Sequence, residues 1–224
     1  MWRPSAPEGP AGSIRIRRTP VCGSCTFRPV LLRWCKAIIA PRPIGWISTV
    51  DTEGRPNLAP YSFFNAVSSR PNMIGFSSDG YKHSPRNARD TGEFVFNLST
   101  RPLLEQMNRT SEEVEDGVNE FDFAGLGMTP SKLVAPPRVT EAPAALECKV
   151  VSCDELTDMH GASTGRWWVV GQVVAVYIDD DLIRDGRFDT AKAQPLGRCG
   201  YRDYATAGDL FELLRPTDPG RVIR

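Results

Sequence analysis

Short apolar and alternating runs, separated by turn-forming residues, recur along the chain after its first 35 residues. Residues 45–50 predict a strand, residues 51–54 (Asp-Thr-Glu-Gly) its turn, and residues 57–67 the returning strand of a hairpin. Further along, residues 144–156 and 166–178 predict two long strands, joined through residues 161–165. Strand-like patterns therefore dominate.

One polar-rich segment, residues 101–114, has helical spacing instead. Its apolar residues Leu103, Leu104 and Met107 fall on one side of the predicted helix, and acidic residues close it. Together the elements predict a mainly β fold with flanking helices.

Side chains on a strand alternate between its two faces, which limits what each residue of the hairpin can contact. Ser48 and Thr49 are predicted to point to opposite faces, and so are Ser62 and Phe63. We therefore expect at most one residue of each pair to face a ligand directly. The other serves the core or bonds through its backbone.

The candidate chemistry is concentrated in three segments, residues 41–50, 60–65 and 82–87. They combine aromatic and aliphatic side chains with clustered hydroxyls, two amides and several cations. A flat aromatic ring needs apolar walls and a few directed hydrogen bonds, whereas a phosphate needs cations, hydroxyls and backbone N–H groups. This combination indicates flavin mononucleotide (FMN).

The phosphate would be held at the start of a predicted helix. Ser84 reads as the N-cap and Pro85 as the first helical residue. Such a helix directs its first N–H groups and its positive dipole end toward an anion. Lys82 and Arg86 add positive charge, and Asn87 falls in the first turn.

The same segments resemble the flavin reductase-like family of FMN-binding split barrels. The shared features are Pro-Arg-Pro-Ile at residues 41–44, Ser-Phe-Phe-Asn at 62–65, the element at 82–87 and the strand-like residues 93–98. The resemblance extends over residues 36–204 in the family's order. It implies a single-domain Greek-key split β-barrel, normally a homodimer, with FMN near the subunit interface.

The resemblance also implies which residues contact the cofactor, and His83 departs from it because relatives carry an acidic residue there. Many relatives have a histidine where this chain has Tyr177, which weakens the expectation of nicotinamide handling more than that of FMN binding. The implied FMN-binding residues are Arg42, Trp46, Ser48, Thr49, Ser62, Phe63, Phe64, Asn65, Ser77, Lys82, Ser84, Arg86 and Asn87.

Several of these residues have an ordinary structural interpretation as well. Trp46, Phe63 and Phe64 could be barrel core, because buried aromatic residues are common. Lys82 and Arg86 could be solvated surface cations. Their occurrence together, in family order, favours the cofactor site.

Composition and charge restrict the partners. The 224 residues, 41% of them hydrophobic, suit one domain with a sizeable core. The 27 basic and 27 acidic residues cancel, so no long-range field favours nucleic acid or an anionic membrane. No apolar run approaches the roughly 18 residues that span a bilayer. We expect a cytoplasmic protein whose partners are small molecules and a second copy of itself.

The two ends of the chain differ from the predicted domain of residues 36–205. Residues 1–35 carry six arginines against one acid, Glu8, with scattered prolines and no sustained periodicity. They lack the apolar core of a secretory signal, and their prolines argue against the amphipathic helix of a mitochondrial presequence. We expect a disordered or atypical extension there, and a tail over residues 206–224.

The cysteines and a late acidic run are the candidates for a metal or redox site. Cys22 and Cys25 have metal spacing, but no second pair follows and the chain has only two histidines. Cys148 and Cys153 are expected on opposite faces of their strand, unable to chelate together. The aspartates at 179–181 read as a solvated strand end. No metal site is predicted, and reduced, mostly packed thiols are expected.

These observations predict an FMN-dependent flavoprotein oxidoreductase, with hydride passing from NADH or NADPH to flavin N5. No residue stands out as a required acid or base. The chain lacks the Gly-x-Gly-x-x-Gly fingerprint of a separate nicotinamide domain, so a nicotinamide would stack over the flavin in the same pocket. The alternatives are a non-catalytic FMN-binding or electron-transfer barrel, and a barrel that has lost its cofactor.

Overall fold

The protein is described by a computed structural model that covers residues 32–112, 114 and 117–213. Cys22 and Cys25, most of the predicted extension and the end of the predicted tail lie outside the described residues. Helix α1 (Leu32–Ile38) spans the boundary placed at residue 36.

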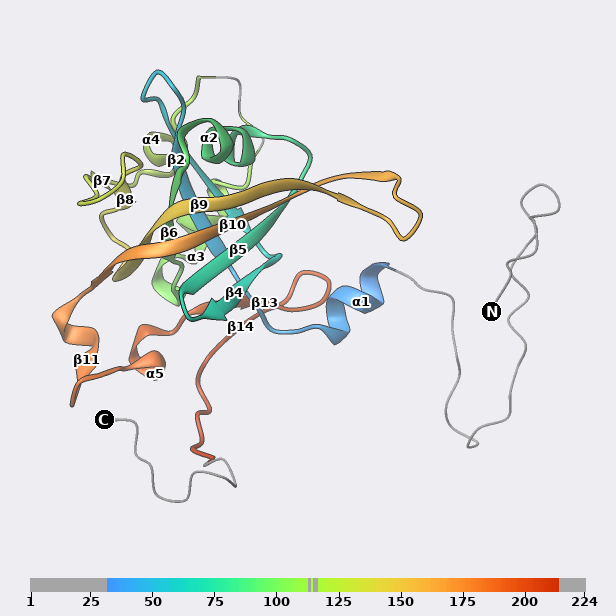
Figure 1. Cartoon of the computed structure of the whole chain (residues 1–224). Coiled ribbons are helices and arrows are strands. Elements are labelled where there is room, and N and C mark those ends of the chain that lie inside the picture. Colours follow the sequence, from blue (N-terminus) through green and yellow to red (C-terminus); the bar gives the residue numbers. More distant parts are fainter. Residues whose placement is uncertain (1–31, 113, 115–116, 214–224) are drawn as a thin grey trace, which may run out of the picture.

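Seven antiparallel strands form the main sheet, which is strongly curved (Figure 1). Their spatial order is β3-β2-β6-β9-β10-β5-β4. The strands are β2 (Gly45–Val50), β3 (Pro56–Tyr61), β4 (Phe64–Ser69), β5 (Asn72–Asp79), β6 (Glu93–Leu98), β9 (Ala144–Thr157) and β10 (Ser163–Ile178). The mainly β prediction is confirmed, and the first strand of the hairpin and the two long strands lie where the pattern placed them.

Smaller elements complete the fold. A three-stranded sheet has the order β1-β13-β14, and two short hairpins pair β7 with β8 and β11 with β12. Their bounds are β1 (Arg42–Pro43), β7 (Met128–Thr129), β8 (Arg138–Val139), β11 (Ile183–Arg184), β12 (Arg187–Phe188), β13 (Leu196–Arg198) and β14 (Tyr204–Thr206). The further helices are α2 (His83–Thr91), α3 (Leu104–Arg109), α4 (Glu120–Ala124) and α5 (Thr190–Ala193), with 3₁₀ turns at Arg101–Leu103 and Asp180–Leu182.

The barrel interior is a cluster of fully buried side chains that includes Ile47, Phe76, Phe94 and Val169. Tyr61 on β3 packs against Phe76 on β5, with ring centroids 4.8 Å apart. Because β3 is at one end of the sheet order and β5 is next to the other end, this contact requires the sheet to curl on itself. Helix α2 covers one end of the barrel and contributes Ala88 to its core (Figure 1).

A second core lies outside the barrel, between β2–β3 and helices α3 and α4. Trp46 is fully buried there beside Leu58, Met107 and Phe121. Its indole N–H donates to Thr110 Oγ1 at 2.9 Å. Both faces of β2 are therefore buried, Ile47 toward the barrel and Trp46 toward the helices.

The predicted strand over residues 57–67 is wrong as one element, because the structure divides it into β3 and β4. Strand β3 pairs with β2, whereas β4 pairs with β5, so the chain passes from one end of the sheet order to the other. Ser62 and Phe63 form the bend between them. Closing a barrel interrupts the ladder at this corner, and alternation along a strand does not apply to these two residues.

The predicted helix over residues 101–114 is also shorter in the structure. It consists of a 3₁₀ turn and α3, which ends at Arg109. Thr110 donates its hydroxyl to the Met107 carbonyl at 2.8 Å, and Ser111 donates to the Asn108 carbonyl at 2.6 Å. Such local side-chain bonds compete with helical ones and favour the helix end.

The prediction that Cys148 and Cys153 face opposite sides is wrong. The pairing of β9 with β10 shifts register at Val151, which is the extra residue of a β-bulge. A bulge reverses the alternation beyond it. Both cysteines therefore pack against the barrel core, Val151 is exposed, and burial raises the pKa of both thiols.

Gly171 on β10 provides the first test of this packing. A Cβ at this position would overlap the ring of Phe94 in the barrel core. We expect Gly171→Ala to lower the free energy of unfolding by about 1–3 kcal/mol, the usual cost of overpacking. Urea denaturation would measure the loss. Gly208→Ala is the matched control because its Cβ would meet no atom within 4 Å; equal midpoints for both variants would contradict this packing.

Candidate functional site

A hollow of about 470 Å³ opens where the start of α2 meets β3 and the chain after α3. Its walls combine polar and cationic residues with residues of β3. It is lined by Asn57, Ala59, Pro60, Tyr61, Tyr81, Lys82, His83, Ser84, Arg86, Thr110, Ser111, Glu112, Val114 and Glu120.

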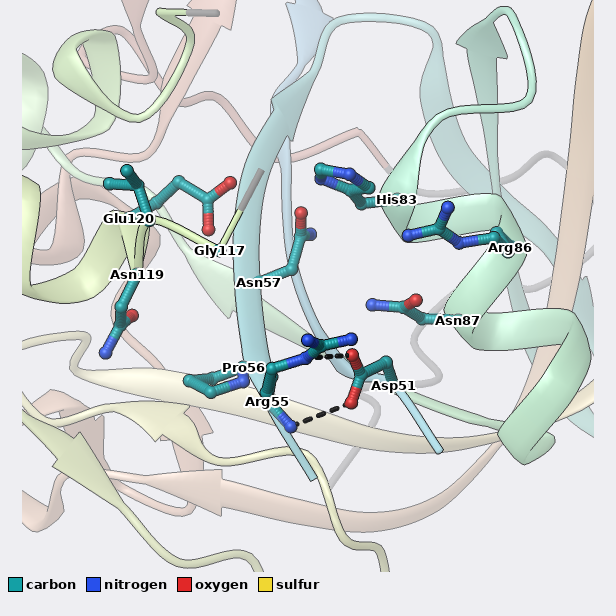
Figure 2. A pocket seen from close by; sticks show the side chains of 11 residues that line it. Asp51, Arg55, Pro56, Asn57, His83, Arg86, Asn87, Gly117, Asn119 and Glu120 are labelled. Atoms are coloured by element: carbon teal, nitrogen blue, oxygen red, sulfur yellow. Dashed lines mark hydrogen bonds and ion pairs between the residues drawn. The ribbon is translucent and has the colours of Figure 1, made fainter. Parts of the chain in front are cut away.

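A second hollow of about 400 Å³ adjoins the first and shares Asn57, His83, Arg86 and Glu120 with it. Figure 2 shows His83 and Arg86 on the α2 side, Glu120 on the opposite side, and the carboxamide of Asn57 between them. At its outer end Arg55 and Asp51 form an ion pair of 2.6 Å. The two hollows make one continuous polar depression at the start of α2.

Helix α2 starts earlier than predicted, which changes the role of Ser84. Lys82 is the N-cap and His83 the first helical residue, so the prediction of Ser84 as N-cap and Pro85 as first residue is wrong. Pro85 still lies in the first turn, where its missing N–H leaves no intrahelical bond unmade. The helix N-terminus nevertheless faces the hollow, because Lys82, His83, Ser84 and Arg86 all line it.

A buried polar network fixes this helix start to the β2–β3 hairpin. Asn57 Nδ2 donates to Ser84 Oγ at 2.9 Å, and Asn87 Nδ2 donates to Thr49 Oγ1 at 3.2 Å. All four residues are buried. Sequence reasoning missed Asn57, although it lies directly opposite Thr49 in the hairpin register.

The other residues expected from β2 and β1 have internal contacts. Ser48 is fully buried, donates to the Pro137 carbonyl at 2.6 Å and accepts from Asn97. Trp46 and Thr49 are also fully buried, and none of the three is among the residues that line the two hollows at the start of α2. Arg42 lines a third hollow, which also includes Ser62.

The residues expected around the corner between β3 and β4 are dispersed. Phe64 stacks on Phe96 with centroids 4.8 Å apart, and Phe63 is exposed beside Arg42. Asn65 is exposed and accepts from the N–H of Ala66. Ser77 donates its N–H to the Phe63 carbonyl at 2.8 Å. The structure therefore brings Lys82, Ser84, Arg86 and Asn87 together at the start of α2. The four residues around the β3–β4 corner lie outside that group.

Glu120 is a buried acidic residue of the site that sequence reasoning missed. It is 7% exposed at the start of α4. Burial raises its pKa, while the N–H that Leu58 donates to Oε2 at 3.2 Å and the nearby His83 oppose the shift. The cations Lys82 and Arg86 lie on the α2 side of the depression, and Glu120 lies on the opposite side (Figure 2).

Tyr177 lies near the end of β10, in a cluster with Val95 and Val134. Its hydroxyl donates to Asp179, which raises the pKa of the phenol. The guanidinium of Arg138 stacks over its ring at 3.7 Å. It is not among the residues that line the three hollows.

The family called "Flavin reductase like domain" matches residues 39–194 of the chain. An uncharacterized protein of Aquifex aeolicus is 35% identical over 176 residues, which cover 76% of this chain and 86% of that protein. The chain therefore belongs to the flavin reductase-like family, as its motifs predicted.

Two solved structures resemble the fold closely. Nitrilotriacetate monooxygenase component B from Bacillus cereus aligns with a TM-score of 0.77 and 27% identity, over 85% of this chain and 100% of that one. The 2-nitrobenzoate 2-nitroreductase NbaA from Pseudomonas fluorescens aligns with a TM-score of 0.72 and 31% identity, over 82% and 89%. The predicted split-barrel fold is confirmed.

The described part of the chain offers no candidate for a membrane-spanning helix or a metal centre. No helix there is both long and apolar enough to cross a membrane. Among the same residues, no three His, Cys, Asp or Glu side chains are grouped so that they could hold a metal ion.

The raised pKa of Glu120 predicts how the folding stability of the protein depends on pH. A carboxyl whose pKa is higher in the folded state than in the unfolded state makes its full contribution to folding stability at pH values below its unfolded pKa. This contribution is lost as the pH rises through the folded pKa. Glu120→Gln keeps an acceptor for Leu58 and removes the charge. We expect it to raise Tm at pH 7–8 by roughly 2–4 °C, the effect of about 1 kcal/mol in a domain of this size.

The advantage of Glu120→Gln should vanish below about pH 4, near the ordinary glutamate pKa. Thermal melts between acid and neutral pH would measure it. Glu105→Gln, at an exposed position on α3, is the control and should show no such trend. A Tm advantage of Glu120→Gln that grows toward acid pH would contradict a raised pKa for Glu120.

Proposed function

We propose that this protein is an FMN-binding flavoprotein oxidoreductase that holds its cofactor in the hollow at the start of α2. The observation that carries the proposal is the convergence of Lys82, Ser84 and Arg86 on one hollow at a helix N-terminus. Membership of the flavin reductase-like family supports the same conclusion. The volume of about 470 Å³ lies within the usual range for cofactor pockets.

The donors in the hollow fit a phosphate at one end. Lys82 and Arg86 supply charge-assisted hydrogen bonds, and the first turn of α2 supplies its N–H groups and dipole. Ser84 Oγ is held in place by Asn57, so the phosphate side of the site is preorganised. Ala59, Pro60 and Val114 provide apolar wall for a ring system extending away from the helix.

When bound, FMN would supply the hydride and electron transfer, and the protein would position it. The carboxylate of Glu120 repels the phosphate from the far wall and so favours one orientation of the cofactor. NADH or NADPH as the electron donor, and a homodimer with FMN near the subunit boundary, belong to the same proposal. The exposed apolar residues Phe63, Val67 and Val176 offer surface for a second copy.

The phosphate assignment is tested by removing the two cations. Replacing Lys82 and Arg86 with Ala should weaken FMN binding by about 1.5–3 kcal/mol for each charge-assisted hydrogen bond to the phosphate that the variant cannot make. Fluorescence titration of FMN would measure the affinity, alongside the visible spectrum of protein after gel filtration. Arg89→Ala removes one positive charge from α2 at a position that does not line the hollow, so this control variant should bind FMN normally. Unchanged affinity in the double variant would reject the site.

Turnover separates an enzyme from an electron carrier. We expect the FMN-loaded protein to oxidise NADH or NADPH steadily when free FMN is supplied as acceptor, measured by the loss of absorbance at about 340 nm that is general for reduced nicotinamides. The double variant of Lys82 and Arg86 serves as control and should require much more FMN. Retained flavin without nicotinamide oxidation would favour the electron-transfer alternative.

A further inference from the structure

The third hollow lies between β1, β13, α3 and the corner after β3, with a volume of about 320 Å³. Lys36, Arg42 and Arg198 line it, and no Asp or Glu is among its lining residues. The protein as a whole is neutral, so three cations around one small hollow are a local concentration of positive charge. This arrangement favours an anionic ligand.

Arg42 makes the charge imbalance severe because it is buried, with only 8% of its surface exposed. Its Nη1 donates to the carbonyls of Lys36 and Ile39, and its Nη2 donates to the Cys199 carbonyl at 3.2 Å. Within the described residues its Nε has no acceptor, and no carboxylate lies at ion-pair distance. Burying a charge without an opposite charge is costly, so an anion in the hollow would compensate it.

The other two cations are held by aromatic side chains. The guanidinium of Arg198 stacks over the ring of Tyr204 at 4.5 Å and donates to the Tyr201 carbonyl at 2.8 Å. Lys36 Nζ lies 5.7 Å from the ring centroid of Phe63. These contacts restrain the cations without neutralising them, because an aromatic face carries no net charge.

The rest of the wall is apolar or aromatic. Ile44, Pro60 and Met107 provide aliphatic and thioether surface, and Tyr201 and Tyr204 provide rings. The volume is near the lower limit of ligand pockets, about 300 Å³, so it suits a single ring rather than a dinucleotide. An anion with one aromatic ring matches both the charge and the walls.

The hollow adjoins the flavin site, since Pro60 and Ser111 line both. We propose that it binds a small aromatic carboxylate, with the carboxylate toward Arg42, Arg198 and Lys36 and the ring toward Pro60. As a binding site it depends only on these residues. As the site of a co-substrate that meets the cofactor, it rests on the proposed function.

Benzoate is the probe, because it is a single-ring carboxylate that flavin does not alter. We expect calorimetric titration of FMN-loaded protein to show benzoate binding at least tenfold tighter than benzamide, its neutral analogue. Lys36→Gln and Arg198→Gln should each weaken benzoate at least tenfold and leave FMN affinity unchanged. Arg202→Gln, at an exposed position that does not line the hollow, should bind benzoate normally. Arg42 is left intact because it connects α1 to the chain after β13.

Three results would overturn the proposal. The first is equal affinity for benzoate and benzamide, or benzoate binding that both charge variants retain. The second is competition between benzoate and FMN, which would make the hollow part of the flavin site. The third is loss of NADPH affinity but not benzoate affinity in the variants, which would assign the cations to a nicotinamide nucleotide. If the wild-type protein does not bind FMN, the proposed function is rejected. Benzoate titration of the protein without FMN would then test this site by itself.

Discussion

The hydrogen bonds from Asn57 to Ser84 and from Asn87 to Thr49 connect the first turns of α2 to the β2–β3 hairpin. The hollow exists only where these elements meet, because its walls come from β3 on one side and α2 on the other. Each bond lies among buried residues, where an unmade hydrogen bond costs more than a made one contributes. This network therefore fixes the helix start, and every cation on that turn takes its position from it.

The closure of the barrel imposes the second constraint. The chain must pass from β3 to β4 at opposite ends of the sheet order, and it does so at Ser62 and Phe63. This corner places Phe63 near Lys36 and Arg42 and brings Pro60 between two hollows. A feature of sheet geometry thereby decides which polar groups share a cavity.

Local pattern predicted the elements whose cause is local. The strand-forming residues 45–50 and the apolar runs of β9 and β10 depend on their own residues, as do the cations on either side of Ser84. The break between β3 and β4, the bulge at Val151 and the roles of Asn57 and Glu120 depend on contacts between distant segments. Glu120 is 62 residues from Leu58, its backbone donor, and no short pattern encodes that proximity.

The chain has no net charge, but cationic and acidic side chains lie on opposite sides of the depression at α2. This separation would orient the proposed ligands. In the depression at α2, Lys82 and Arg86 face a wall that contains the buried Glu120. A phosphate is therefore favoured at the helix and disfavoured opposite, since charge interactions strengthen away from bulk water. In the proposed site, a flavin with its phosphate at the helix would extend along β3 toward Pro60 and Ser111, which also line the hollow of Arg42 and Arg198. In that arrangement the buried Glu120 would favour an orientation of the proposed cofactor with its ring toward the cationic hollow, where the proposed carboxylate would meet it.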